Sequence, residues 1–357
     1  MFRSTIITRV RKCLQFVYAL WWSCFKPWHL PFRKSKHNQV QLKKMNNVMK
    51  RFYHTPELVI NDFDNINFFT FPSTDNLTLS GLTYIPHPNS QKWIISLHWF
   101  AGDKFFGLYH AQFLTKLGYN VMSFDFRGHA KSANDTSTLG IKEVRDALGA
   151  LAWLKANHNP EQVVLLGTSM GAYVTNYLSL SDPDLVQEYK IKFGISDCGF
   201  GSLESLFQNV RNRHLHLVPK RKTKQIVKWL LKKGNKVEAK ANIDLFDANL
   251  FKLMEQGHTP SYPIFFSHAK NDGVTPGFDT MQLIDQRAKL IKDDDYILYN
   301  YCIHTQALRS HFKNHVRAIS HYVALRDNNQ SEYEQLVKEW KLDQIISKKD
   351  LKDEKLS

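Results

Sequence analysis

Apolar, strand-like runs alternate with helical stretches through most of this sequence, and this alternation limits the possible folds more than any other feature. The runs occupy residues 92–98, 119–124, 162–167, 191–196, 263–268 and 295–301. Helical patterns lie between them, near residues 107–117, 140–157, 170–181, 278–291 and 307–325. Such alternation predicts an α/β fold with a doubly wound, mostly parallel sheet. Residues 66–86 are expected to start this sheet as an antiparallel pair.

The alternation is interrupted between residues 200 and 262 by helical, basic sequence. An insertion that follows a strand at the carboxyl edge of a parallel sheet is expected to form a cap over that edge. We therefore predict three regions. They are a basic N-terminal segment over 1–56, an α/β domain with its inserted cap over 57–326, and a charged C-terminal tail over 327–357.

The net charge of +15 is concentrated in two regions. Residues 1–56 carry twelve Lys or Arg and no Asp or Glu, and residues 201–262 carry twelve basic and five acidic residues. The rest of the chain is mildly acidic. No nucleic-acid recognition module is recognisable, so we expect no nucleic-acid partner. An anionic membrane surface explains the basic N-terminal segment more economically.

An uncharged apolar run, CLQFVYALWWSCF, occupies residues 13–25 and is flanked by basic residues. Extended to residue 32, it reaches the length of about 20 residues that a membrane span needs. No small-residue cleavage site follows it. We expect an uncleaved anchor or interfacial helix at 13–32, with a soluble helix packed on the body as the alternative. The excess of basic residues after the run favours a cytoplasmic location for the rest of the chain.

A second amphipathic stretch lies in the cap, over residues 219–233 (PKRKTKQIVKWLLKK). Its apolar side chains are expected to share one helix face and its lysines the opposite one. Two interpretations stay open. The apolar face either covers the site of the domain, or rests with the N-terminal segment on an anionic bilayer.

Residues 163–173 have the sequence VVLLGTSMGAY, in which an apolar, strand-like run leads to Ser169. Glycine stands two residues before this serine and two residues after it. Ser169 in this G-x-S-x-G pattern would occupy a sharp strand-to-helix turn, where larger neighbours would clash. The following helix N-terminus favours developing negative charge. The pattern predicts that Ser169 is a nucleophile.

A serine hydroxyl needs a histidine base held by a carboxylate. After Ser169, the loop AKNDGVTP places Asp272 at the end of a strand, and YCIHTQAL places His304 after the next strand. The order Ser169, Asp272, His304 is the one that this architecture uses. Other candidates are Asp197 for the acid, and, for the base, three histidines within a helix: His311, His315 and His321.

The negative charge that forms on a substrate carbonyl oxygen needs two backbone N–H donors, the oxyanion hole. One should come from Met170, directly after the candidate nucleophile. The other should come from the loop LHWFAGD, from the N–H of Phe100.

These motifs resemble the α/β-hydrolase superfamily over residues 65–325. HWFAGD is similar to its H-G-x-x-G loop, FDFRGHAKS to its D-x-R-G-H-G-x-S, and GTSMG to its nucleophile turn. The chain looks similar to bacterial members with an N-terminal hydrophobic segment, in the serine-aminopeptidase and dienelactone-hydrolase-like branch. SDCGFGSLESLF, which opens the cap, also fits that group.

Two positions depart from the pattern of this superfamily. Trp99 stands where glycine is usual, which could reshape or partly cover the oxyanion loop, and Ala130 replaces a second glycine. His98 and His129 are expected to be structural and to fix their two loops.

The resemblance and the three residues together predict a serine hydrolase that acts on a small or lipid-like carboxylic ester through an acyl-enzyme. No metal or organic cofactor is expected, and the four cysteines show no metal-binding spacing. An aminopeptidase or amidase is the alternative enzyme, although the strongly basic cap holds only three Glu residues (Glu204, Glu238 and Glu255). A catalytically idle, membrane-tethered binding module is the alternative from another class, and Trp99 is the feature in its favour.

Overall fold

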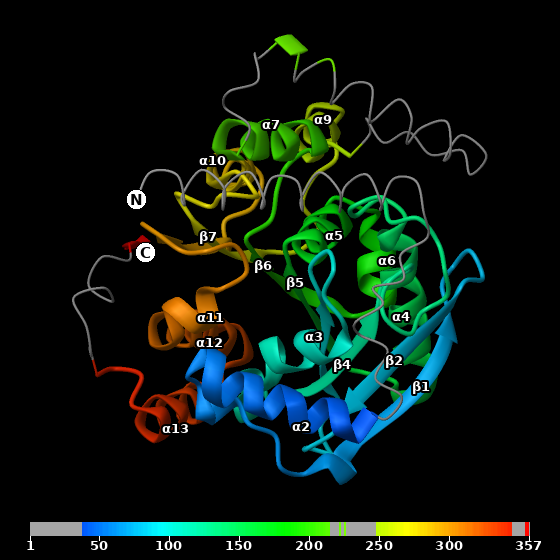
Figure 1. The fold of residues 1–357 in the computed structure, drawn as a ribbon, viewed down its shortest axis with the longest axis vertical. Helices are drawn as coiled ribbons and strands as arrows, with labels where there is room; N and C mark the ends of the chain where they lie inside the picture. The colour runs from blue at the N-terminus through cyan, green and yellow to red at the C-terminus, as the bar shows by residue number, and fades with distance from the viewer. Residues whose placement is uncertain (1–37, 215–220, 223–224, 226–247, 345–353, 357) are drawn as a thin grey trace, which may run out of the picture.

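The centre of the molecule is a mostly parallel β-sheet with helices on both faces (Figure 1). The computed structural model describes residues 38–214, 221–222, 225, 248–344 and 354–356. Within these residues the sheet has nine strands in the order β1-β2-β4-β3-β5-β6-β7-β8-β9. This architecture confirms the predicted fold class.

The strands follow the predicted apolar runs. Their bounds are β1 (Ile66–Pro72), β2 (Thr78–Tyr84), β3 (Lys92–Leu97), β4 (Asn120–Asp125), β5 (Gln162–Thr168), β6 (Ile191–Asp197), β7 (Ile264–Ala269), β8 (Asp295–Tyr299) and β9 (Glu354–Leu356). Each pair of neighbours in the order β4-β3-β5-β6-β7-β8 is parallel. β1 and β2 form the expected antiparallel pair, and β9 pairs antiparallel with β8.

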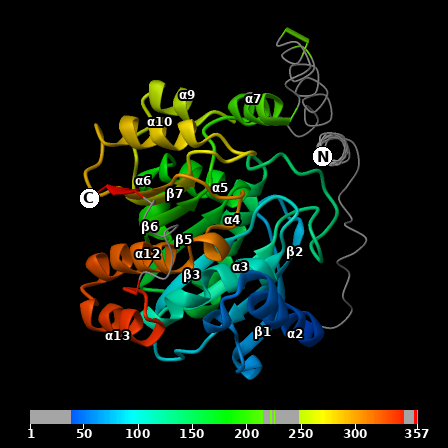
Figure 2. The same cartoon turned by 60° about the vertical axis from the view of Figure 1, so that its left-hand side comes forward.

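Two helical layers cover the sheet. On one face lie α4 (Glu143–His158), α5 (Met170–Ser179), α6 (Pro183–Glu188) and α10 (Gly277–Arg287). On the other face lie α2 (Asn38–Val48), η1 (Met49–Tyr53), η2 (Pro56–Leu58), α3 (Lys104–Ala111), η4 (Gln112–Leu117), α11 (Ala307–Ser310), α12 (Phe312–Asp327) and α13 (Gln330–Trp340), with the short η3 (Phe63–Asn65) at the start of β1 (Figure 2).

The central strands are apolar on both faces because each face is covered by helices. Successive side chains of a strand point to opposite faces. Ile94 and Val164 therefore belong to one core, whereas their neighbours Ile95 and Leu165 belong to the other.

The basic N-terminal segment and the charged tail both contribute packed helices. Leu42 and Met45 of α2 are buried in the same core as Leu336 of α13. The expected anchor at 13–32 lies outside the described residues and stays a prediction. Among the helices that the structure does describe, none is long and apolar enough to cross a membrane.

The inserted cap begins with α7 (Leu203–His214) and returns through α9 (Leu250–Glu255). Its two ends are tied together, because the N–H of Leu203 donates to the Ala248 carbonyl (3.1 Å) and the N–H of Leu250 to the Gly201 carbonyl (2.8 Å). Both views place α7 and α9 near α10, beyond the carboxyl end of the sheet (Figures 1 and 2). Most of the predicted amphipathic helix at 219–233 lies outside the described residues.

Two buried histidines, His110 of α3 and His315 of α12, should make folding sensitive to acid. Burial lowers the pKa of His110 to about 4 and that of His315 to about 3. The unfolded chain therefore binds protons first, so the stabilisation is complete above pH 6.5 and is lost as the pH falls toward 4, by up to about 1.4 kcal/mol per pH unit for each histidine. Urea unfolding at pH 7.5 and 4.5 measures this loss, and His110→Phe should reduce it. An equal loss in wild type and His110→Phe would contradict the assignment to His110.

Candidate active site

Ser169 occupies the turn between β5 and α5 with an unusual backbone. Its φ is 56° and its ψ is −108°, and the side chain is buried. The turn requires glycine both two residues before and two residues after Ser169. A Cβ on Gly167 would lie 2.1 Å from the carbonyl oxygen of Gly171, and a Cβ on Gly171 would lie 2.1 Å from the carbonyl oxygen of Leu97. A serine held in a strained backbone conformation by close neighbours is what the G-x-S-x-G pattern predicts.

The loops after β7 and β8 bring the predicted acid and base to Ser169. His304 Nε2 lies 2.8 Å from Ser169 Oγ, and His304 Nδ1 lies 2.7 Å from Asp272 Oδ2. These distances fit a neutral ring that donates from Nδ1 to the carboxylate and accepts the serine proton at Nε2. The structure thus brings together the three residues selected from chain order.

The acid is held in its ionised form by hydrogen bonds on both oxygens. Oδ1 accepts the N–H groups of Val274 (2.7 Å) and Thr275 (3.1 Å), and Oδ2 accepts the Thr275 hydroxyl (3.1 Å). Burial by itself raises the pKa of Asp272, but the His304 ring and these donors bring the pKa below its ordinary value. Sequence reasoning missed Thr275, because a threonine three residues after an aspartate carries no recognisable pattern.

The rival acid, Asp197, is hydrogen-bonded to Ser267 and to the backbone of Ser169. Its Oδ1 accepts the Ser267 hydroxyl (2.8 Å), and its backbone carbonyl accepts the Ser169 N–H (2.8 Å). Burial raises the pKa of Asp197 to about 6. Asp197 therefore supports the turn of Ser169, whereas His304 is bonded to Asp272.

The rival bases are occupied elsewhere. His311 Nε2 lies 2.8 Å from the Tyr301 carbonyl, and His315 Nδ1 lies 2.8 Å from the Tyr299 hydroxyl. His321 packs against a tyrosine ring of α13.

The two residues expected to supply the oxyanion donors, Phe100 and Met170, line the cavity beside the candidate nucleophile. Met170 is the first residue of α5, so its N–H has no partner within the helix. Phe100 borders the same cavity as Ser169 and Met170.

Two histidines connect the loop of Phe100 to the loop after β4. His98 Nδ1 donates to the Trp99 carbonyl (2.7 Å), and Nε2 accepts the Phe126 N–H (3.1 Å). His129 Nδ1 donates to the Arg127 carbonyl (2.9 Å), and Nε2 accepts the Ala101 N–H (3.1 Å). Each ring therefore bonds the backbone of both loops, which is the structural role expected for them.

Trp99, the departure from the resembled pattern, packs on the rings of Phe106 (4.8 Å) and His110 (5.0 Å). It borders the cavity beside Ser169 without filling it. This cavity has a volume of about 240 Å³ and is lined by Trp99, Phe100, Ala101, Leu139, Ser169, Met170, Phe200, Leu206, Val274 and His304. Apart from Ser169 and His304, every lining residue is apolar or aromatic.

One group of potential metal ligands lies here. Within the described residues, ligand atoms of Cys198, Asp272 and His304 lie within 4.8 Å of one another. Burial raises the pKa of the Cys198 thiol, which keeps it protonated, and hydrogen bonds already occupy both Asp272 oxygens. This donor set fits a hydrogen-bonded acid and base better than a metal site.

Similar proteins share this architecture. The Pyrococcus furiosus esterase Pf2001 superposes with a TM-score of 0.56 at 19% identity, over 75% of this chain and 91% of the esterase. The Pyrococcus horikoshii acylaminoacyl peptidase gives 0.55 at 16%, over 74% of this chain and 41% of the peptidase. The chain has the α/β-hydrolase fold.

Two sequence comparisons also match this chain. A family model described as serine aminopeptidase, S33, matches residues 95–191. The uncharacterized Bacillus subtilis protein YqkD is 24% identical over 259 residues, which are 70% of this chain and 77% of YqkD. The family match supports a hydrolase of the serine type, and the solved structures, at their low identity, show the fold.

Proposed function

We propose that the protein is a serine hydrolase that cleaves a carboxylic ester through an acyl-enzyme intermediate. The observation that carries this proposal is the continuous set of hydrogen bonds from Ser169 through His304 to Asp272, at the wall of an apolar cavity. A nucleophile, a base and an oriented acid are the groups that acyl transfer needs.

In the first half of the reaction, His304 Nε2 removes the proton from Ser169 Oγ as that oxygen attacks the ester carbonyl carbon. The carbonyl oxygen becomes negatively charged, and the N–H groups of Phe100 and Met170 stabilise it. The bond to the alcohol oxygen then breaks, and His304 gives its proton to the departing alcohol. Asp272 keeps the ring in the required tautomer and stabilises its positive form.

In the second half, water attacks the acyl-enzyme carbonyl and loses its proton to His304. The second oxyanion collapses, the bond to Ser169 Oγ breaks, and the serine regains its proton from His304 as the carboxylic acid leaves. The proposed reaction needs no metal or organic cofactor.

The lining of the cavity favours an ester over an N-terminal peptide as the substrate. An aminopeptidase has to bind the charged amine of its substrate, for which a carboxylate is the usual partner. Among the described residues that line the cavity there is no Asp or Glu. Glu204 and Glu255 of the cap are exposed, and Glu238 lies outside the described residues.

An aminopeptidase or amidase is the second candidate, because the matching family model is named for a serine aminopeptidase. A catalytically idle binding module is less consistent with the geometry, since the three residues are hydrogen-bonded and Trp99 leaves the cavity open.

A substrate panel tests the proposal. Purified protein is assayed with p-nitrophenyl acyl esters and with aminoacyl p-nitroanilides, and Ser169→Ala serves as the matched control for background hydrolysis. We expect kcat/KM for the esters to be at least about 100-fold above that for the anilides. The apolar lining of the cavity has no carboxylate among its described residues, so the charged amine of an aminoacyl anilide would have no partner there. Faster cleavage of the free aminoacyl anilides than of every ester would favour the aminopeptidase instead.

A further inference from the structure

One wall of the cavity comes from the loop between β4 and α4, which the proposed mechanism does not use. Of the residues in this loop, 126–142, Leu139 is the one that lines the cavity. The loop begins within the FDFRGHAKS motif and continues as ANDTSTLGIK from residue 133 onward.

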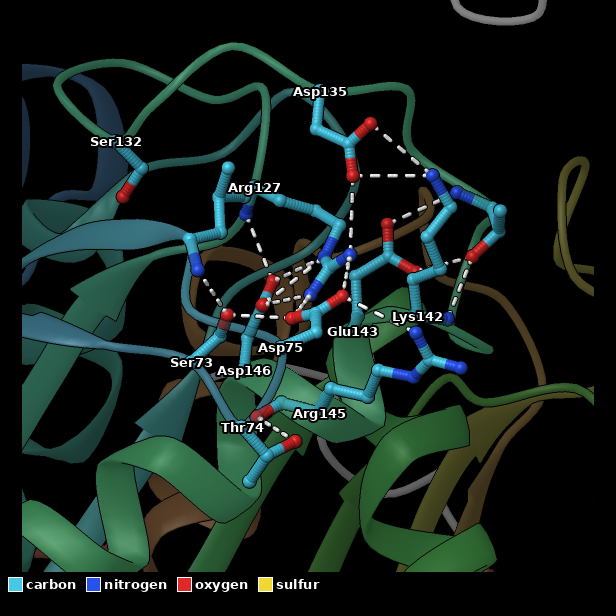
Figure 3. Close-up of polar contacts among 12 residues, drawn as sticks. Ser73, Thr74, Asp75, Arg127, Ser132, Asp135, Lys142, Glu143, Arg145 and Asp146 are labelled. Atoms are coloured by element: carbon cyan, nitrogen blue, oxygen red, sulfur yellow. Dashed lines mark hydrogen bonds and ion pairs between the residues drawn. The ribbon is translucent and has the colours of Figure 1, made fainter. Parts of the chain in front are cut away.

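Buried charged side chains hold this loop in place (Figure 3). Glu143, the first residue of α4, is fully buried, and its carboxylate accepts four hydrogen bonds from the loop. The donors are the Ser137 hydroxyl (2.6 Å), the Thr138 N–H (3.1 Å) and hydroxyl (2.9 Å), and the Gly140 N–H (2.9 Å). Glu143 thereby fixes Ser137, Thr138 and Gly140, which lie on both sides of Leu139 in the chain.

A second anchor acts further back in the same loop. The guanidinium of Arg127, which is 1% exposed, donates to Asp135 (3.1 Å) as well as to Asp146 of α4 (2.7 Å). Lys142 also pairs with Asp135 (3.1 Å). Figure 3 shows these pairs converging on Asp135 from both ends of the loop. A network of this kind, in which Arg127, Lys142 and Asp146 are buried and Asp135 is partly exposed, rigidifies what it holds.

The backbone at the cavity is strained. Leu139 has a φ of 58°, in the left-handed region that costs a non-glycine residue about 1–2 kcal/mol. Gly140 has a φ of 133°, and a Cβ there would lie 2.3 Å from the Tyr173 ring. Strain of this kind persists where the surroundings impose it, and it concentrates at functional sites. The strain here directs Leu139 to the cavity.

The loop also contacts Met170, whose N–H is one of the two expected oxyanion donors. The Ser137 hydroxyl, which accepts the Leu139 N–H (3.3 Å), lies 3.6 Å from the sulfur of Met170. Tyr173, against which Gly140 packs, stacks on Phe200 at 4.9 Å, and Phe200 lines the cavity too. A leaving alcohol has to lie beside His304, which protonates it, so the wall beside Met170 belongs to the acyl group.

We propose that Leu139 is a specificity-determining residue that limits the length of an uncharged, apolar acyl group. This inference rests on the proposed ester hydrolysis. A group the size of a water molecule takes about 30 Å³, so a cavity of about 240 Å³ has room for about eight carbon-sized groups, shared between the acyl group and the alcohol. Rigid packing around Leu139 prevents the wall from yielding to a longer chain.

The test compares kcat/KM for p-nitrophenyl butyrate, octanoate and dodecanoate. Leu139→Ala should raise the ratio of dodecanoate to butyrate about tenfold or more, because pocket space worth one or more methylene groups changes discrimination by at least that factor. Leu139→Phe should lower the ratio. Ile141→Ala is the matched control, because Ile141 belongs to the same loop and is half-buried, but does not line the cavity. Its ratio should stay within twofold of wild type.

The outcomes separate this inference from the function on which it rests. If wild type hydrolyses none of the esters, the proposed function is wrong. If wild type is active but Leu139→Ala and Leu139→Phe keep its chain-length profile, Leu139 does not determine specificity. Leu139→Phe retains a large apolar side chain, so it provides the measurement even if Leu139→Ala fails to fold.

Discussion

Replacing Ser169 with alanine should lower kcat for ester hydrolysis by about 1,000-fold or more while the fold is retained. The variant loses the oxygen that lies 2.8 Å from His304 Nε2 and so cannot form the acyl-enzyme. Residual activity would come from the oxyanion donors and substrate binding alone. Turnover of purified protein with p-nitrophenyl butyrate measures the loss, and circular dichroism checks the fold.

A matched control is available in the neighbouring strand. Ser196 of β6 is also buried, and its hydroxyl has no hydrogen-bond partner within the described residues. Ser196→Ala makes the same chemical change away from the proposed nucleophile and should keep kcat within about twofold. A fluorophosphonate probe should label wild type and Ser196→Ala but not Ser169→Ala. Near wild-type turnover by Ser169→Ala would exclude Ser169 as the nucleophile.

The sequence was sufficient to predict the strands and to predict that Ser169, Asp272 and His304 lie together, and the reason is local. A strand covered on both faces is a continuous apolar run, as β5 shows, and the turn of Ser169 accepts only glycine at residues 167 and 171. Chain order then selected Asp272 and His304, because loops at one edge of a parallel sheet meet in space.

The sequence did not reveal features that depend on distant partners. α2 is a polar helix whose buried Leu42 and Met45 are too few to indicate that it joins the core. Leu139 shows the same limit at the site. Its position depends on Glu143 and Arg127, whose hydrogen bonds to the loop become visible only when the chain is folded. A leucine before a glycine is, by itself, an ordinary loop sequence.

Replacing Asp272 with asparagine should lower kcat by about 1,000- to 10,000-fold, an effect comparable to that of Ser169→Ala. An amide in place of the carboxylate would present N–H to His304 or favour the wrong tautomer, so Nε2 could no longer accept the proton of Ser169. Asp272→Asn combined with Ser169→Ala should be little worse than Ser169→Ala alone, because the residues act as one unit. Additive losses in the double variant would contradict the shared role.

Asp197→Asn is the matched control for the acid, since it makes the same change in the other buried carboxylate near His304. Its kcat should stay within a few-fold of wild type, because the asparagine oxygen can still accept the Ser267 hydroxyl.

The stabilisation that the Asp197 carboxyl gives wild type should fall as the pH rises. The folded pKa of about 6 lies above the ordinary value of 3.8, so the stabilisation from this group is present below pH 3.8 and is lost as the pH rises through 6. The asparagine does not ionise, so urea unfolding should show the variant gaining stability relative to wild type between pH 5 and pH 8, by up to about 1.4 kcal/mol, because one pH unit separates pH 5 from the folded pKa of about 6. A well-folded but inactive Asp197→Asn, beside an active Asp272→Asn, would transfer the role of the acid to Asp197.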